Sequence, residues 1–128
     1  MQPIPLPAIM IVDDDPLFRS LTSMLLESRG LTVSTANGCV EALELLPKTE
    51  PGIAIVDMVM PEYDGIATIR QLRAANPELV VIACSGHNAE EFEAALRNLQ
   101  VKEFIAKPFT IDELVVTMER AMSQSAAA

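Results

Sequence analysis

Short, uninterrupted apolar runs alternate with stretches of helical periodicity along this chain of 128 residues. Three of the runs, residues 8–12 (AIMIV), 53–56 (IAIV) and 79–83 (LVVIA), are apolar at every position. Because a strand that is buried on both faces needs apolar side chains at successive positions, these runs predict central strands of a parallel sheet. Two weaker runs, residues 31–36 and 103–106, predict strands nearer the sheet edges.

The segments between the runs have the periodicity and the end signals of helices. Apolar residues recur at i, i+3, i+4 and i+7 in residues 92–99 and again in residues 111–118, so each predicted helix has one buried stripe. Asp15 followed by Pro16 is a typical start of a helix, and Gly30 follows the expected end of that first helix. Five strands that alternate with five helices are therefore expected.

This alternation predicts a single α/β domain in which helices cover both faces of a parallel sheet. We expect the domain to span residues 8–122, with an N-terminal extension at residues 1–7 and a C-terminal tail at residues 123–128. Ligands of such sheets bind beyond the carboxyl ends of the strands. The residues that directly follow each apolar run are therefore the candidates for chemistry.

The composition excludes several kinds of partner. Eighteen acidic residues against nine Lys and Arg give a formal charge of −9, which disfavours direct binding to nucleic acid or to an anionic membrane. No apolar run has the length of a membrane span, and residues 1–7 lack the positive charge that begins a signal peptide. The two cysteines, Cys39 and Cys84, have no metal-ligand spacing and fit a reducing compartment. We therefore expect a soluble cytoplasmic protein.

Acidic residues follow two of the buried runs. Asp13, Asp14 and Asp15 come directly after the first run, and Asp57 comes directly after residues 53–56. A helix cap accounts for Asp15 but not for three acids in a row. Carboxylates that converge at one sheet edge repel one another unless a cation lies among them. Mg²⁺ suits such a place, because it binds one or two carboxylates together with water and phosphate oxygens.

Two other polar residues follow the last two runs. Ser85 comes after the run at residues 79–83, and Lys107 comes after the run at residues 103–106. A hydroxyl and an ammonium can both hold phosphoryl oxygens beside Asp57. A carboxylate can itself accept the phosphoryl group and form an aspartyl phosphate. Taken singly, Lys107 is an ordinary surface lysine and Ser85 an ordinary strand residue. Together with the carboxylates, they predict a Mg²⁺-assisted phosphoryl acceptor.

Four short motifs stand at these strand ends: Val12-Asp13-Asp14, Asp57-Met58-Val59-Met60-Pro61 with Asp64-Gly65, Ser85-Gly86, and Lys107-Pro108-Phe109. In this order they resemble the receiver domain of two-component response regulators, in particular the single-domain regulators of the chemotaxis type. The resemblance covers residues 8–122. It implies a flavodoxin-like (βα)5 fold with the strand order 2-1-3-4-5, and a Lys-Pro bond that is commonly cis in this family.

The resemblance also implies roles for individual residues. Asp57 would accept a phosphoryl group from a phosphohistidine on a sensor histidine kinase or a histidine phosphotransfer protein. Asp13, Asp14 and Asp57 would hold Mg²⁺ together with the backbone carbonyl of Val59. Lys107 would pair with the phosphoryl oxygens. The protein would then be a phosphoacceptor that promotes only its own phosphorylation and dephosphorylation, rather than an enzyme.

The resemblance implies a switch as well. The Ser85 hydroxyl would move to the phosphoryl group, and Phe104, a plain core aromatic on the alternative reading, would swing inward. The switched surface would be the face of the fourth helix, fifth strand and fifth helix, which includes Arg97, Lys102 and Glu103. A downstream protein would bind this face, and the chain would be a monomer or a phosphorylation-dependent dimer.

Two positions beside the acceptor bear on how long the phosphoryl group lasts. Val59 is apolar and stands two residues after Asp57, and His87 stands two residues after Ser85. In receiver domains both positions flank the path of the hydrolytic water. We therefore hypothesise that Val59 makes self-dephosphorylation slow, whereas His87 is either a modulator of that water near neutral pH or an exposed loop histidine.

Three other functions compete with this interpretation. A pseudo-receiver binds partners without phosphorylation and usually lacks one or more of the site residues. This sequence has all five of them: Asp13, Asp14, Asp57, Ser85 and Lys107. A Mg²⁺-dependent aspartyl-phosphate hydrolase would have a second acid two residues after the nucleophile, where Val59 stands. A flavin carrier would need a hydroxyl-rich phosphate loop and aromatic residues that flank the flavin, and the sequence has only four Phe, one Tyr and no Trp.

Overall fold

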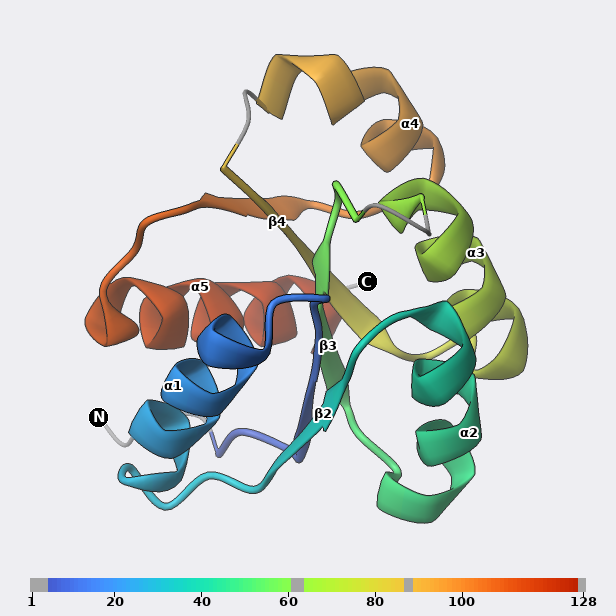
Figure 1. Ribbon diagram of the computed structural model, residues 1–128. Coiled ribbons are helices and arrows are strands. Elements are labelled where there is room, and N and C mark those ends of the chain that lie inside the picture. Colours follow the sequence, from blue (N-terminus) through green and yellow to red (C-terminus); the bar gives the residue numbers. More distant parts are fainter. Residues whose placement is uncertain (1–4, 61–63, 87–88, 127–128) are drawn as a thin grey trace.

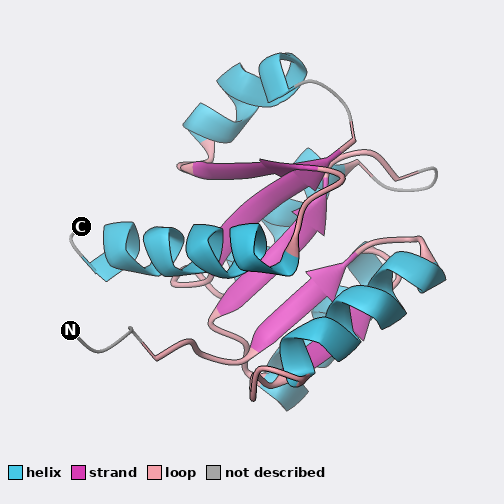
Figure 2. Cartoon of the chain, turned by 90° about the vertical axis from the view of Figure 1, so that its left-hand side faces the viewer, coloured by secondary structure: helices cyan, strands magenta, loops and turns pink. Residues whose placement is uncertain are grey.

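A five-stranded parallel sheet with helices on both faces forms the centre of the computed structural model, which describes residues 5–60, 64–86 and 89–126 (Figure 1). The strands lie in the order β2-β1-β3-β4-β5, which confirms the flavodoxin-like topology. Their bounds are β1 (Ile9–Val12), β2 (Val33–Ala36), β3 (Ile53–Asp57), β4 (Val80–Ser85) and β5 (Glu103–Ala106). All neighbouring strands pair in parallel, so their carboxyl ends meet at one edge (Figure 2).

The helices divide between the two faces of the sheet. They are α1 (Pro16–Glu27), α2 (Cys39–Thr49), α3 (Gly65–Ala75), α4 (Glu93–Asn98) and α5 (Ile111–Ala126). Helices α1 and α5 lie on one face and α2 and α3 on the other, while α4 lies near β5 at the top of Figure 1. None of the helices in the described part of the chain has the length and apolarity needed to cross a membrane.

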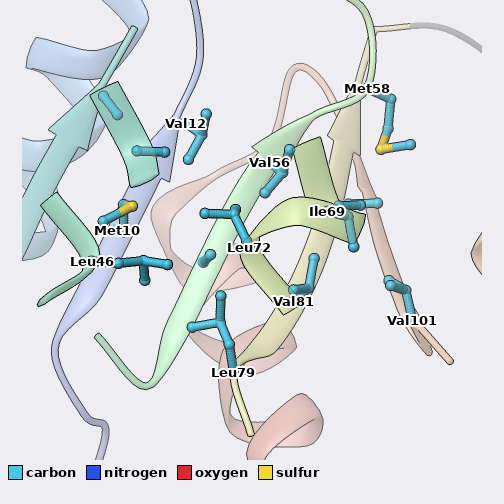
Figure 3. Close-up of a cluster of buried hydrophobic side chains, with 14 of the residues drawn as sticks. Met10, Val12, Leu46, Val56, Met58, Ile69, Leu72, Leu79, Val81 and Val101 are labelled. Carbon is cyan, nitrogen blue, oxygen red and sulfur yellow. The ribbon is translucent and has the colours of Figure 1, made fainter. Parts of the chain in front are cut away.

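Both faces of the sheet are buried, as the continuous apolar runs predicted. In β1, Ile9 and Ile11 belong to the core beneath α1 and α5, whereas Met10 and Val12 belong to the core beneath α2 and α3 (Figure 3). All four side chains are fully buried. Successive strand residues therefore serve opposite cores, and two residues that are two positions apart serve the same one.

The start of α1 follows its sequence signals. The Asp15 side chain caps the helix by accepting a hydrogen bond from the backbone N–H of Leu17 at 3.0 Å, and Pro16 occupies the first turn. The chain leaves the helix through Gly30, whose φ of 83° is a left-handed value that glycine adopts without strain. The position of α1 is therefore fixed directly beside the acidic residues that precede it.

The two helices predicted from apolar periodicity are both present. The segment predicted at residues 92–99 forms α4 over Glu93–Asn98, and a 3₁₀ turn, Ala89–Phe92, precedes it. Helix α5 continues to Ala126, so residues 123–126, which we expected to be a tail, are helical.

A close backbone approach positions the loop after β3. A Cβ atom on Gly65 would lie 2.5 Å from the Met58 Cα atom and 2.7 Å from the Asp57 carbonyl oxygen. Only glycine fits there without moving backbone. The first turn of α3 thus packs directly on the residues that follow β3, and it holds Asp57 and Met58 in place.

Candidate functional site

Three charged side chains extend the sheet face that α1 and α5 cover. Asp13, Asp57 and Lys107 each stand two residues beyond an isoleucine of the core beneath those helices. Because strand side chains alternate, this spacing directs all three toward the same side of the sheet. Residues at the carboxyl ends of β1, β3 and β5, far apart in sequence, therefore meet at one end of the sheet.

Lys107 compensates the charge of the two buried acids. Its Nζ atom lies 2.6 Å from Oδ2 of Asp13 and 3.5 Å from Oδ2 of Asp57. The side chains of Asp13 and Asp57 are only 2% and 9% exposed, and that of Lys107 is 23% exposed. Charged groups in such positions are stable only when they are paired and hydrogen-bonded.

Asp14 completes the acidic cluster from the solvent side. Its side chain is exposed, yet one carboxylate oxygen from each of Asp13, Asp14 and Asp57 lies within 4.8 Å of the other two. The turn after β1 therefore brings the carboxylates of Asp13 and Asp14 together. Hard oxygen ligands at this spacing suit a small divalent cation, and the excess of acid over lysine provides the charge to hold it.

The surroundings shift the pKa values of two of these groups. Burial raises the pKa of Asp57 above its ordinary value of 3.8, although a hydrogen bond from the Val59 N–H and the charge of Lys107 both oppose the rise. Burial lowers the pKa of Lys107, but the hydrogen bond to Asp13 and the charges of Asp13 and Asp57 more than reverse that effect. Lys107 therefore stays an ammonium at neutral pH.

Asp13 is held from three directions. Its Oδ1 atom accepts a hydrogen bond from the Asp15 N–H at 2.9 Å, and its Oδ2 atom accepts one from Lys107. The Arg19 guanidinium donates to the backbone carbonyl of Asp13 at 2.7 Å. The ring of Phe18 lies beneath the Lys107 ammonium, 4.0 Å from Nζ to the ring centroid.

Arg19 and Phe18 were not identified from the sequence. Both lie in the first turn of α1, close to the cap at Asp15, and helices that begin at a strand's carboxyl end point their first turn at the site. Counting from the predicted cap could have nominated these positions. Which of them reaches the acids depends on how α1 packs on the sheet, and local sequence does not carry that information.

Ser85 and Phe104 lie on the other side of the sheet. Ser85 is fully buried at the end of β4, directly after Cys84, which pairs with Asp57 across the sheet. Phe104 is half-buried, pairs with Ala83 of β4 and packs on the core beneath α2 and α3. Since Ala83 and Ser85 are two positions apart, Ser85 and Phe104 share the face that also packs against α4.

The remaining residues singled out from the sequence have different settings. Val59 is 45% exposed, and its N–H donates to Oδ1 of Asp57 at 3.1 Å. Glu103 is buried in a two-point ion pair with Arg120 of α5, whose nitrogen atoms lie 2.7 and 2.8 Å away. Burial raises the pKa of the Cys84 thiol to about 12, which makes this cysteine chemically inert at neutral pH. His87 lies outside the described residues.

The backbone of the last strand end also has the form that the sequence suggested. The Lys107-Pro108 bond is cis. The N–H of Lys107 donates to the carbonyl of Ser85 at 2.9 Å, so the segments after β4 and β5 are linked directly at the site.

Comparison with known proteins gives a consistent result. Residues 9–119 match the family model described as "Response regulator receiver domain". Over 117 residues the chain is 38% identical to the C4-dicarboxylate transport transcriptional regulatory protein DctD of Rhizobium meliloti, and 35% identical to the DNA-binding transcriptional regulator NtrC of Escherichia coli. Each alignment covers 90% of this chain but only 25% and 24% of those proteins, so the chain spans about a quarter of their length.

A solved structure gives the same picture in three dimensions. The receiver domain of NtrX from Brucella abortus is 30% identical to this chain and superposes with a TM-score of 0.81. The match covers 90% of this chain and 98% of that domain.

Because the pKa of Asp57 is raised, replacing its carboxylate by a neutral side chain should stabilise the folded protein by an amount that depends on pH. Above that pKa, the buried carboxylate is charged and destabilises the folded state relative to a neutral side chain; below 3.8 it is protonated in both states, and the effect disappears. We expect Asp57→Asn to raise the free energy of unfolding at pH 7 by on the order of 1 kcal/mol. The gain should shrink as the pH falls toward 4.

Urea unfolding between pH 8 and pH 4, in buffer with a chelator, measures this difference. Asp15→Asn is the matched control, because the Asp15 side chain is exposed and asparagine still caps a helix. A difference between Asp57→Asn and the unmodified protein that is constant over this pH range would contradict the assignment.

Proposed function

This chain belongs to the response regulator receiver domain family, and we propose that Asp57 is the residue on which it accepts a phosphoryl group. Receiver domains are phosphoacceptors rather than classical enzymes. The main support is the convergence of Asp13, Asp14 and Asp57 at a position that the Lys107 ammonium also reaches. A phosphorylation-independent binding module is not favoured, because every residue type that the chemistry requires is present.

The acidic cluster fits Mg²⁺. We propose that Asp13, Asp14, Asp57 and the backbone carbonyl of Val59 hold this ion, with room left for water and a phosphoryl oxygen. When bound, the ion would neutralise negative charge on the oxygens of the transferring group. The network around Asp13, with donors on both of its oxygens, keeps one side of the cluster fixed.

The protein's own residues would perform the transfer. A carboxylate oxygen of Asp57 attacks the phosphorus of a phosphohistidine, the new O–P bond forms, and the P–N bond to the imidazole breaks. The electron pair of that bond stays on the imidazole nitrogen, which then takes up a proton. The Val59 N–H and the Lys107 ammonium favour the ionised, nucleophilic form of Asp57, in opposition to the effect of burial. Lys107 then pairs with the oxygens of the transferred group.

The signal would leave the site through the other face of the sheet. Ser85 lies next to the residue that pairs with Asp57, and Ser85 and Phe104 share the face that packs against α4. A hydroxyl drawn to the phosphoryl group would favour one of two packings of the loop after β4, which shifts a population rather than creating a new fold. A groove of about 700 Å³ between α4 and β5, lined in part by Leu96 and Phe104, is the surface that would change.

We propose a protein, rather than DNA, as the direct target of this switched face. The relatives named above are transcriptional regulators about four times as long as this chain, and the chain matches only one part of them. Its formal charge of −9 disfavours contact with phosphate backbones. A phosphorylation-dependent dimer and a phosphorelay role remain compatible with the same face.

A second surface fits the phosphoryl donor. Four large apolar side chains of α1 are exposed, at i, i+4, i+7 and i+8, and they form one stripe; they are Leu17, Leu21, Met24 and Leu25. The stripe borders an apolar groove of about 440 Å³ between α1 and the segment from Lys107 to Phe109. A histidine kinase or phosphotransfer protein bound there would be adjacent to the acceptor carboxylate, which is why we propose this stripe as its docking surface.

The acceptor role of Asp57 is tested with a small phosphodonor. We expect incubation with acetyl phosphate and Mg²⁺ to add one phosphoryl group, detected by intact mass. Asp57→Ala should abolish the gain, because no other carboxylate has the same pairing with Lys107 and the Val59 N–H among the described residues. Asp15→Asn should leave the gain intact. A phosphoryl group that still appears on Asp57→Ala would disprove the assignment.

The docking surface is tested by comparing two donors. Met24→Glu places a charge in the α1 stripe at a residue that does not line the groove beside Lys107, so phosphorylation by acetyl phosphate should stay unchanged. Transfer from an autophosphorylated histidine kinase that recognises this protein should fall about tenfold or more, the cost of about one buried large apolar side chain. Val116→Glu on α5 is the matched control, because Val116 and Met24 are both exposed, at 54% and 64%. Equal transfer rates for the two variants would rule out the α1 stripe.

The lifetime of the phosphoryl group depends on Val59 in our proposal. Its side chain is 45% exposed beside Asp57 and offers no hydrogen bond to an attacking water. We expect the phosphorylated protein to persist far longer than seconds. Val59→Asn, which keeps the backbone carbonyl, should shorten the lifetime about tenfold, the equivalent of one hydrogen bond in the transition state. Decay of the isolated phosphoprotein, followed by intact mass with Val116→Asn as control, gives the answer; decay of the unmodified protein within seconds contradicts the hypothesis.

A further inference from the structure

We propose that Phe18 is a positioning residue for phosphoryl transfer: its ring face holds the Lys107 ammonium beside the carboxylates without occupying a hydrogen-bond donor. The inference rests on the proposed acceptor role of Asp57. The Nζ atom of Lys107 lies 4.0 Å from the centroid of the Phe18 ring. At this distance the negative face of an aromatic ring attracts a cation.

Lys107 needs such a restraint because of what its donors must do. An ammonium has three N–H donors on a flexible four-carbon stem. One of them is directed at Asp13, at 2.6 Å, whereas Asp57 is farther away, at 3.5 Å. Held by Asp13 alone, the ammonium would be drawn away from the group that it must stabilise.

The ring face supplies attraction without competing for donors. It adds a third contact to those with Asp13 and Asp57, and it leaves N–H groups of the ammonium for oxygens of a phosphoryl group on Asp57. Because the ring does not ligate metal ions, it would not be diverted from the ammonium if Asp13 held a cation. Phe18 can therefore keep Lys107 at the site throughout the transfer.

The ring itself is locked in place. Phe18 is half-buried in the core beneath α1 and α5, where it packs edge-to-face with Phe109, with ring centroids 5.8 Å apart and an interplanar angle of 88°. This is a preferred geometry for aromatic pairs. Phe109 lies in the same short segment as Lys107, so α1 and the segment after β5 fix the ring and the ammonium relative to each other.

A fluorine series separates the electrostatic role of the ring from its packing. Replacing Phe18 by 4-fluoro-, 3,5-difluoro- and 3,4,5-trifluorophenylalanine withdraws electron density from the ring face while the shape stays nearly constant. We expect the rate of phosphorylation by acetyl phosphate with Mg²⁺ to fall stepwise, by about fivefold for the trifluoro variant. The thermal midpoint should not fall. The same series at Phe92, which packs on the opposite core, is the control and should leave the rate unchanged.

A second measurement does not depend on phosphorylation. In the metal-free protein, the ring current of Phe18 should shift the ε-methylene protons of Lys107 upfield in the NMR spectrum. Phe18→Tyr should keep that shift, and Phe18→Leu should lose it.

The outcomes separate this inference from the proposed function. The role of Phe18 is overturned if the phosphorylation rate is the same across the fluorine series, or if the Lys107 chemical shifts do not change in Phe18→Leu. The proposed acceptor role of Asp57 is unaffected by that result as long as the unmodified protein is phosphorylated. A wild type that takes up no phosphoryl group overturns the proposed function, and the role of Phe18 with it.

Discussion

The ammonium of Lys107 compensates the buried negative charge at the carboxyl edge of this sheet. Two carboxylates, Asp13 and Asp57, are almost fully buried, and removing such charges from water without a partner costs several kcal/mol each. Lys107 lies within ion-pair distance of both. The three residues meet because each stands two residues beyond a strand isoleucine that faces α1 and α5, so all three point to the same side of the sheet. The parallel topology therefore brings together the charges that compensate one another.

The same edge connects the two faces of the sheet. Lys107 is on the side of α1 and α5, where Phe18 and Arg19 brace the acidic residues. Ser85 is on the side of α4, and its carbonyl accepts the hydrogen bond of the Lys107 N–H. The segments that carry the proposed ammonium and hydroxyl donors are therefore joined by a backbone hydrogen bond at the end of the sheet. At the opposite end of β5, the ion pair between Glu103 and Arg120 fastens the strand to α5.

The sequence was sufficient for those features that depend on local pattern. Continuous apolar runs located β1, β3 and β4, which are buried on both faces. The acids of the cluster follow two of these runs, and Lys107 follows the weaker run at residues 103–106. What could not be predicted depends on packing between elements. The ring of Phe18 reaches Lys107 because α1 docks beside β1 and α5, and no local sequence pattern specifies that packing.

Charge alone cannot be what the switched state reports. Three carboxylates against one ammonium leave the site with two negative charges in excess. Those charges are cancelled when a divalent cation is bound, and a phosphoryl group, with about −1.5 to −2 charges at neutral pH, takes the place of a carboxylate that carried one. With the cation bound in both states, phosphorylation would change the net charge of the site by only about −0.5 to −1. The larger difference would lie in geometry: new acceptor oxygens would stand beside Asp57, and the donors that we propose for them, on Lys107 and Ser85, belong to opposite faces of the sheet. Such a switch would need a lysine that is held near the site without committing its N–H donors, a condition that an aromatic face can provide and a direct ion pair cannot.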